Sequence, residues 1–400
     1  TIWAIRPALG VNGDVDSAML QFKGHLRPCA VSEARTHNVC LFHTAQFVRK
    51  QRCKKLKSDT RFVFRALPDG PATSPSASAS ARAVLDKTAG RMTYKPLSYG
   101  EMVNDAVESI MAALNDGLRW LEVEFPALPT NVDGYKGSSD LFIDSNTQLA
   151  LAGAKRLAAR GRKVHIVLPD EGEYSRTYRI FKNNIQLAEG VTVGHLKEAD
   201  PPNPLAALFA GVGGGGAPSS REAGERADTY IFINATCVEL LNLRAYVEKL
   251  PGGPESGRAL VLWNMELDTL RGDLGLPAFP PKELHYAFLS RFRPVFYLRP
   301  RDYSKSVPVP PFIVNYSGAM FREYPGPWQV MLKQDGGEYA CIAEEPVRYN
   351  LGEVKEELTV AMGLATEEEG STMQFLRRGY KTSTWYEDDY EQEASHEWRL

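Results

Sequence analysis

The middle of the chain alternates short apolar runs with longer amphipathic stretches, and this rhythm limits the available folds more than any other feature. The apolar runs are rich in β-branched and aromatic residues: WLEVEF (120–125), VHIVLP (164–169), VTVGHL (191–196), TYIFINA (229–235), RALVLWN (258–264) and RFRPVFYLRP (291–300). Short apolar runs that alternate with helices are typical of parallel strands buried on both faces. The sequence therefore predicts an α/β fold with a Rossmann-like, mostly parallel sheet flanked by helices.

Two helix starts are indicated by capping residues. Ser98 precedes the amphipathic stretch YGEMVNDAVESIMAALN and has Glu101 three residues later, which is the pattern of a capping box. A second helix is expected after Ser138 or Ser139, with Asp140 in its first turn, where the helix dipole favours a negative charge. Capping explains these polar residues without any ligand.

From about Pro311 the rhythm changes to strands joined by tight turns. The strand-like runs are FIVNYSGAMFREY, PWQVMLKQ and EYACIAEEPV. Proline fixes φ and glycine accepts positive φ, so both favour turns. The turn residues are Tyr324, Pro325, Gly326 and Pro327 in the first turn, and Asp335, Gly336 and Gly337 in the second. The sequence predicts a C-terminal antiparallel β-meander in which Trp328 begins a strand and buries its indole.

Composition divides the rest of the chain. Residues 1–66 carry twelve Lys/Arg against four Asp/Glu. Within them the run HTAQFVRKQRCKKLKSDTRFVFRA (43–66) is typical of an organelle transit peptide, and a solvated basic tail is the alternative. Residues 366–400 carry nine acids against four bases. We expect a transit-like segment at 1–66, a Ser/Ala/Pro linker at 67–91, an α/β domain at 92–350 with a low-complexity insert at 200–227, and a helical and then acidic tail at 351–400.

Several classes of site lack sequence support. The five cysteines are scattered without a C-x-x-C pair, so neither a disulfide framework nor a zinc site is expected. The run GVGGGG (211–216) follows a helical stretch rather than a strand and is read as a flexible insert, not a dinucleotide fingerprint. His165 is expected to be a hydrogen-bonded core imidazole. No catalytic residue, metal, cofactor or nucleic-acid footprint is predicted, and apolar stretches end well before the roughly 18 residues of a membrane-spanning helix.

Polar residues follow the predicted strands at the edge where their carboxyl ends meet. In open parallel sheets, ligands bind in the crevice at this edge. The residues predicted there are Glu124, Asp170, Glu171, Glu173, Asn234, Asn264, Glu266 and Asp268. Such an acidic edge suits a cation or a basic partner. The alternative is that these side chains cap loops, as polar residues after strands commonly do.

Five segments, in this order, carry a resemblance to a known family: RWLEVEFPALP, YKGSSDLFIDSNTQLALAGAKRLA, KVHIVLPD, VFYLRP and GAMFREYPGPWQVML. Over residues 92–349 the chain resembles an uncharacterised family of chloroplast and cyanobacterial proteins, catalogued as a domain of unknown function. That family includes the plant low photosystem II accumulation assembly factor and a domain fused to some plastid adenylate kinases. The resemblance implies a plastid protein and supplies no catalytic residues.

Three functional hypotheses follow. The first is a non-enzymatic chloroplast auxiliary factor, in the stroma or at the stromal face of the thylakoid, that assists photosystem II assembly through contacts with assembly factors or subunits. Peripheral membrane contact is compatible with this hypothesis. The second is an enzyme or binding protein for small ligands or nucleotide phosphates that uses the crevice at the carboxyl edge. The third, plastid RNA binding, has the least support.

Overall fold

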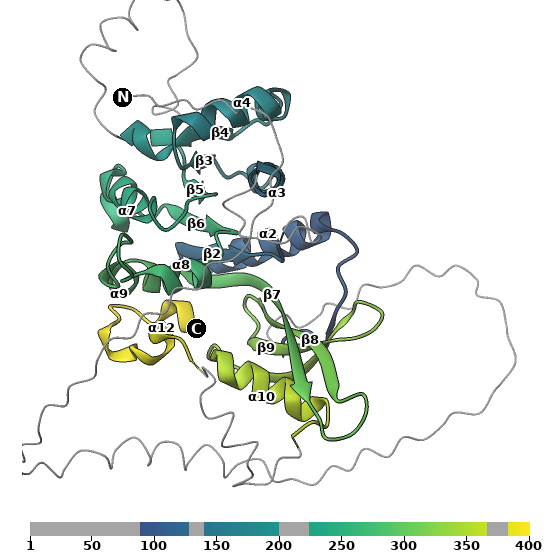
Figure 1. The fold of residues 1–400 in the computed structure, drawn as a ribbon. Helices are drawn as coiled ribbons and strands as arrows, with labels where there is room; N and C mark the ends of the chain where they lie inside the picture. The colour runs from purple at the N-terminus through teal and green to yellow at the C-terminus, as the bar shows by residue number, and fades with distance from the viewer. Residues whose placement is uncertain (1–88, 128–139, 200–223, 366–382) are drawn as a thin grey trace, which may run out of the picture. The chain divides into compact units, whose positions relative to one another are not determined.

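The computed structural model describes residues 89–127, 140–199, 224–365 and 383–400, all within the unit 81–400 (Figure 1). Among them, ten strands form one sheet in the order β1-β10-β9-β8-β7-β2-β6-β5-β3-β4. The predictions for residues 1–88, for most of the insert (200–223), for 366–382, and for Ser138 and Ser139 lie outside the described residues.

The parallel part of the sheet consists of β2 (Trp120–Glu124), β3 (Val164–Leu168), β4 (Val191–His195), β5 (Thr229–Phe232), β6 (Ala259–Trp263) and the first half of β7 (Arg293–Ser306). The antiparallel part consists of β7, β8 (Ile313–Glu323), β9 (Trp328–Lys333), β10 (Tyr339–Glu345) and the short edge strand β1 (Thr93–Tyr94). The predicted fold class, a mostly parallel sheet with a C-terminal antiparallel meander, is confirmed.

Strand β2 lies between β6 and β7, although it is the first parallel strand in the chain. In the dinucleotide-binding order the first strand lies beside the second. Here β3 instead pairs with β4 and β5. Strand β7 is the junction of the two halves, since it pairs in parallel with β2 and antiparallel with β8.

One face of the sheet is covered by α2 (Tyr99–Asn115), α3 (Asp140–Ala158) and α4 (Glu171–Gln186), as Figure 1 shows. Ser98 caps α2 as predicted, accepting a hydrogen bond from the Glu101 amide at 3.3 Å. Gly153 lets α3 approach β6 closely, because a Cβ atom there would lie 2.5 Å from the Trp263 ring. This face is sealed almost entirely by apolar side chains.

The opposite face is covered by α7 (Leu240–Lys249), α8 (Leu267–Asp273) and α9 (Glu283–Ala287) over the parallel half, and by α10 (Leu351–Ala361) over the meander. The 3-10 helices η3 (Leu196–Ala199), η4 (Gly253–Glu255) and η5 (Leu289–Arg291) lie in the connections. Trp328 begins β9 after the 324–327 turn, and its side chain is fully buried among Tyr297, Val330 and Val354.

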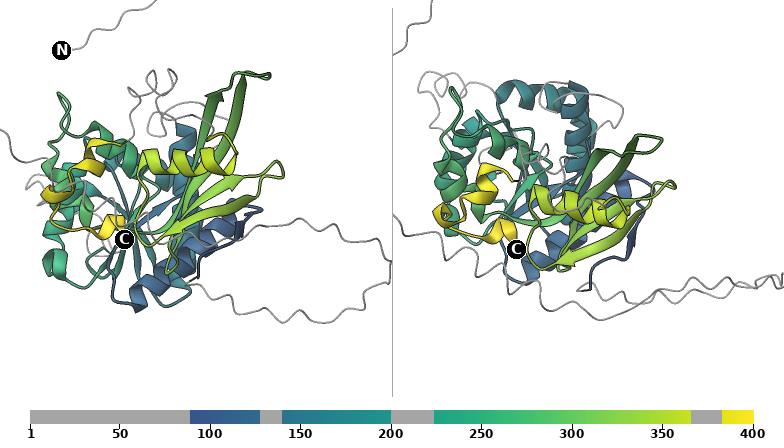
Figure 2. Two further views of the ribbon diagram at one scale, coloured as in Figure 1. Left: turned by 90° about the horizontal axis from the view of Figure 1, so that it is seen from below. Right: turned by 60° about the horizontal axis from the view of Figure 1, so that its bottom comes forward.

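Residues 383–400 are part of the folded domain rather than a tail. They form α12 (Trp385–Asp388), η6 (Tyr390–Gln392) and η7 (Glu397–Arg399), seen in yellow beside α8 and α9 in Figures 1 and 2. The Tyr386 and Trp398 side chains are buried. The acidic-tail prediction is therefore wrong for this segment, because its aromatic residues supply the core contacts. Arg91, assigned to the linker, also belongs to the domain and bonds to Glu323.

Candidate functional site

Three asparagines form a chain of hydrogen bonds at the carboxyl edge of the sheet. Asn234 and Asn264 follow β5 and β6 with φ values of 59° and 52°, a left-handed conformation that asparagine tolerates. Asn146 of α3 bridges them: its amide donates to Asn234 at 2.8 Å and its oxygen accepts from Asn264 at 3.2 Å. The Asn264 oxygen also accepts from the Phe125 amide at 2.9 Å. These amides therefore fasten α3 to the ends of three strands.

Glu124 and Glu266 lie at the same edge. The carboxylate of Glu124 accepts a hydrogen bond from the backbone N–H of Glu266 at 3.0 Å. Glu266 has a φ of 52°, so its amide is presented by an unusual backbone turn. Glu124 is almost completely buried. This bond gives the Glu124 carboxylate the capping role considered for it, and it ties the loop after β6 to the end of β2.

Asp170 and Glu171 belong to a different group, at the start of α4. Asp170 caps this helix by accepting a hydrogen bond from the Glu173 amide at 2.9 Å, and Glu171 is exposed in the first turn. Arg176, one turn later, pairs with Asp144 of α3 at 3.0 Å. Asp140 lies 3.4 Å from the same guanidinium, in the first turn of α3 as predicted. These residues join two helices.

Four guanidinium groups surround the buried carboxylate of Asp268, in the first turn of α8. Arg348 is nearest, with nitrogen–oxygen distances of 2.6 and 2.7 Å, and Arg271 follows at 3.2 Å. Arg299 and Arg301 of β7 lie at 3.7 Å. Burial alone would raise the pKa of Asp268, but the arginines outweigh it and hold that pKa far below the ordinary range. Asp268 is thus ionised at every ordinary pH.

Two further buried groups extend this charged seam, by which we mean Asp268, its four arginines, Glu122 and Tyr297. Tyr297 donates its hydroxyl to Asp268 at 2.8 Å, and burial and the neighbouring carboxylate raise its pKa. Arg271 donates to Glu122 at 3.2 Å. Burial raises the pKa of Glu122, and Arg271 opposes that rise. The seam lies between the two apolar clusters on this face.

The C-terminal segment closes over the charged seam. The Arg271 and Arg348 guanidiniums lie 4.7 and 5.1 Å from the centre of the Trp398 ring, within cation–π range. Tyr386 donates its hydroxyl to the Asp268 carbonyl at 3.2 Å. The Arg348 amide donates to the Arg399 carbonyl at 2.7 Å. The segment therefore supplies the aromatic cover that separates these arginines from water.

Glu393 holds the C-terminal segment together. Its carboxylate accepts from the Trp398 indole N–H and from Arg399, both at 2.9 Å, and lies 3.1 Å from His285. Burial acts to raise its pKa, but bonds from His285 and Arg399 dominate and lower it to about 2. Burial lowers the pKa of His285 to about 4, and its bond with Glu393 only partly opposes this.

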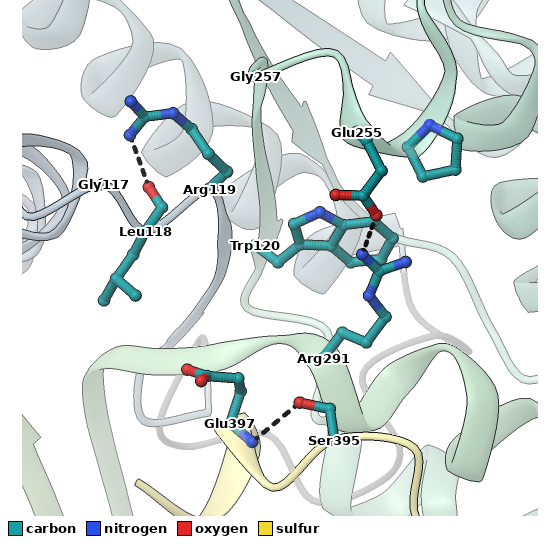
Figure 3. A pocket seen from close by; sticks show the side chains of 10 residues that line it. Gly117, Leu118, Arg119, Trp120, Glu255, Gly257, Arg291, Ser395 and Glu397 are labelled. Carbon is teal, nitrogen blue, oxygen red and sulfur yellow. Dashed lines mark hydrogen bonds and ion pairs between the residues drawn. The ribbon is translucent and has the colours of Figure 1, made fainter.

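A cavity of about 360 Å³ lies at the opposite, amino edge of the sheet (Figure 3). Its walls come from the residues just before β2, β6 and β7 and from the C-terminal segment. They are Gly117, Leu118, Arg119, Trp120, Pro254, Glu255, Gly257, Arg291, Ser395 and Glu397. The volume lies in the range of small-molecule pockets. The sequence did not predict this cavity, because strand starts carry no recognisable ligand pattern.

Charges of both signs line this amino-edge cavity. The Arg291 guanidinium lies 3.9 Å from the centre of the Trp120 ring and pairs with Glu255 at 2.5 Å, as Figure 3 shows. Arg119 donates to the carbonyls of Leu114 and Leu118, at 2.8 and 2.9 Å. Arg291 and Glu255 thus form an ion pair in the wall, whereas Arg119 bonds to backbone carbonyls. The cavity offers charged side chains and an aromatic ring with which a small polar molecule can interact.

His165 is fully buried, as predicted. Its ring nitrogens lie 2.7 Å from Thr192 and 2.7 Å from Glu198. Tyr246 donates to the same glutamate at 2.8 Å. A cavity of only about 40 Å³ adjoins Glu198 and Tyr246, too small for more than ordered water. In the described parts of the chain, no group of three or more His, Cys, Asp or Glu could hold a metal ion, and no helix is long and apolar enough to cross a membrane.

A family model described as "Domain of unknown function (DUF1995)" matches residues 96–356, more than half of the chain. The chain belongs to the DUF1995 family. A search of curated proteins finds no match. The DUF1995 match begins just before α2 and ends within α10, so it includes the asparagine chain and Asp268 but not residues 383–400. In this protein the DUF1995 domain is completed by a segment outside the family model.

The structure brings four of the predicted edge residues together: Glu124, Asn234, Asn264 and Glu266. Sequence reasoning missed Asn146, which lies within the helix-start motif SSDLFIDSNTQ, and the four arginines around Asp268. The available signal was the spacing of Arg299 and Arg301, two apart on one strand, which puts both side chains on one face of the DUF1995 sheet.

Proposed function

We propose that this DUF1995 protein is a non-enzymatic chloroplast auxiliary factor that assists photosystem II assembly through protein–protein contacts at the stromal face of the thylakoid. Family membership supports the domain assignment. The plastid setting and the partners rest on the resemblance of segments such as YPGPWQV to plastid proteins and on the transit-like composition of residues 1–66.

The hydrogen bonding at the carboxyl edge is the observation that favours a binding role over a catalytic one. Asn146, Asn234 and Asn264 direct their amides at one another, and Glu124 is bonded to the backbone of Glu266. Polar groups that are paired in this way fix strand ends and helices. They make a rigid scaffold whose outer surfaces are available for partners.

An acidic and aromatic surface on the C-terminal segment supplies a contact region. The sequence stretch YEDDYEQE (386–393) combines acidic and aromatic residues, and the structure divides it into two parts. Tyr386 is buried, whereas Tyr390 is 51% exposed and stacks on His396 with ring centres 4.2 Å apart. Glu391 is exposed beside it. We propose that this acidic face meets basic loops of assembly partners.

Affinity purification from chloroplasts tests this proposal. A tagged chain is expected to recover photosystem II subunits or assembly factors, and fractionation is expected to place it in the stroma or on thylakoids. A Tyr390→Ser, Glu391→Lys variant should recover less of the same partners, while a control Leu187→Ser variant, just after the end of α4, should recover the same amount. Recovery of no photosystem component by the unaltered chain would contradict the proposal.

Small-ligand binding is a second candidate, and the amino-edge cavity is the observation that favours it. A thermal-shift screen with nucleotides, sugar phosphates and amino acids is the direct test, because a ligand at about 100 times its Kd stabilises the fold by about 2.7 kcal/mol. An Arg291→Ala variant should abolish any shift, since it removes the guanidinium over Trp120. Equal shifts in both proteins would place the ligand elsewhere.

A further inference from the structure

Strands β7 and β8 form a hairpin that extends past the rest of the sheet. They pair from Phe296–Glu323 out to Ser306–Ile313, whereas β9 pairs with β8 only as far as Gly318. Beyond that point the hairpin is a two-stranded ribbon that ends in the loop VPVPPF (307–312). Figure 2 shows the ribbon projecting away from the helical layers.

The tip of this ribbon, which we define as residues 307–313, is apolar and uncharged. It consists of valine, proline, phenylalanine and isoleucine only. Val309, Phe312 and Ile313 are 63%, 59% and 57% exposed. Single exposed apolar residues are common on protein surfaces, but three of them on one protruding loop with three prolines are an unusual concentration.

The backbone of the tip is also prepared for an apolar medium. Three prolines carry no N–H donor. Of the four remaining amides in 307–313, three are bonded inside the tip: Val307 donates to the Phe312 carbonyl at 2.8 Å, Phe312 to Val309 at 2.9 Å, and Ile313 to Pro311 at 2.8 Å. An unpaired backbone donor is expensive to remove from water, so a tip with few of them enters a low-dielectric phase easily.

Contacts behind the tip hold the ribbon in place. Tyr303 and Tyr316 stack across the two strands with ring centres 5.5 Å apart. The Tyr316 hydroxyl lies 3.0 Å from the Thr359 hydroxyl, at the end of α10. Lys305 donates to the Leu364 carbonyl. These contacts fix the position of the ribbon that carries the tip. The tip is therefore already in place before it binds.

We propose that this tip inserts into the interface of a lipid bilayer and attaches the protein peripherally to membranes. A stable protein partner would need roughly 800 Å² from each side. Three side chains do not supply that area, and the exposed flanks of the ribbon are polar, with Asp302, Ser304 and Asn315. A bilayer requires no shape complementarity and accepts a small apolar wedge. This inference stands on the hairpin alone and does not depend on the proposed plastid role.

Vesicle flotation with the full chain tests the insertion. Phosphatidylcholine vesicles at high salt are the appropriate probe, because the basic run 43–66 would bind anionic lipid by charge alone and salt suppresses that attraction. The unaltered chain is expected to float with the vesicles. A Val309→Ser, Phe312→Ser, Ile313→Ser variant should partition at least tenfold less, as expected for the loss of three apolar side chains.

Two controls keep the experiment decisive. A Leu187→Ser variant removes an apolar side chain that is 82% exposed on another part of the surface, and it should float like the unaltered chain. A Phe312→Trp variant reports the position of the tip directly: brominated lipid should quench its added fluorescence. Equal partitioning of the triple-serine variant, failure of the unaltered chain to float, or an unquenched tip tryptophan would each overturn the proposal.

Discussion

Helices α2, α3 and α4 close one face of the sheet with apolar side chains, whereas the other face closes over Asp268, Glu122 and four arginines. The stability of the apolar face depends on how well the volumes and shapes of its side chains fit together. The helices that complete this face, α2, α3 and α4, follow one another in sequence. The charged seam depends on attraction between its arginines and its two carboxylates, and its cover comes from residues 383–400. Removing one partner of a buried ion pair leaves the other charge uncompensated, so a single loss should affect the seam far more than the apolar face.

The largest effect is expected from Asp268→Ala. This change leaves four guanidiniums near one another without their shared counter-charge, and removal of one partner from a buried ionic network destabilises proteins by about 3–5 kcal/mol. Urea denaturation gives the change in the free energy of unfolding. An Asp268→Asn variant keeps the shape and one acceptor, so it should lose less. A loss under about 1 kcal/mol for Asp268→Ala would show that water already reaches the arginines.

The second largest effect is expected from acid, which should destabilise the packing of the C-terminal segment. The pKa of His285 is about 4 in the folded protein, against 6.5 in the unfolded chain, so the unfolded chain takes up the proton first. The stabilisation is complete above pH 6.5 and is lost as the pH falls from 6.5 to 4, by about 3 kcal/mol. Unfolding midpoints measured between pH 7 and 4 test this, and a His285→Gln variant should show a flatter profile. Glu393, with its pKa near 2, contributes a further loss below about pH 4.5.

At the carboxyl edge, Asn146→Ala should have a smaller but clear effect. The change leaves Asn234 and Asn264 each without one amide partner, and a buried polar group left unsatisfied costs about 1–3 kcal/mol. Thermal unfolding and hydrogen exchange at the start of α3 are the measurements. A Gln148→Ala change, two residues along the same helix, serves as the control. Identical unfolding for both variants would mean that water replaces the lost amide.

The smallest loss in unfolding free energy is expected from a substitution on the apolar face. Ile110→Val in α2 removes one methylene from a fully buried side chain and should cost about 0.5–1.5 kcal/mol. The difference in unfolding free energy between this variant and the unaltered chain should be the same at pH 7 and pH 4, because no titratable group is changed. A loss that equals that of Asp268→Ala would remove the distinction between the two faces.

Local patterns predicted the strands, the turn at 324–327 and the buried Trp328, because each depends on neighbours in sequence. They also placed Asn234 and Asn264 at one edge, since parallel strands end together. They could not supply Asn146, whose role depends on the rotation of α3, nor Arg348, which lies 80 residues from Asp268.

The C-terminal segment shows why composition misled. Nine acids suggested a solvated tail, but Tyr386 and Trp398 decide its position because buried aromatic side chains contribute more than exposed carboxylates. The amino-edge cavity was missed for a different reason. It forms where starts of strands that are distant in sequence meet, and Arg291 and Trp120 gave no local sign of their contact.

Trp398 covers arginines that are synthesised long before it. During translation the sheet and its helices can assemble while Arg271 and Arg348 are still open to water on one side. Closure of that face must therefore wait until Trp398 has been made, so a nascent protein passes through a stage in which these two arginines lack their aromatic cover. That stage is where a chaperone with an acidic surface would have its opportunity to bind.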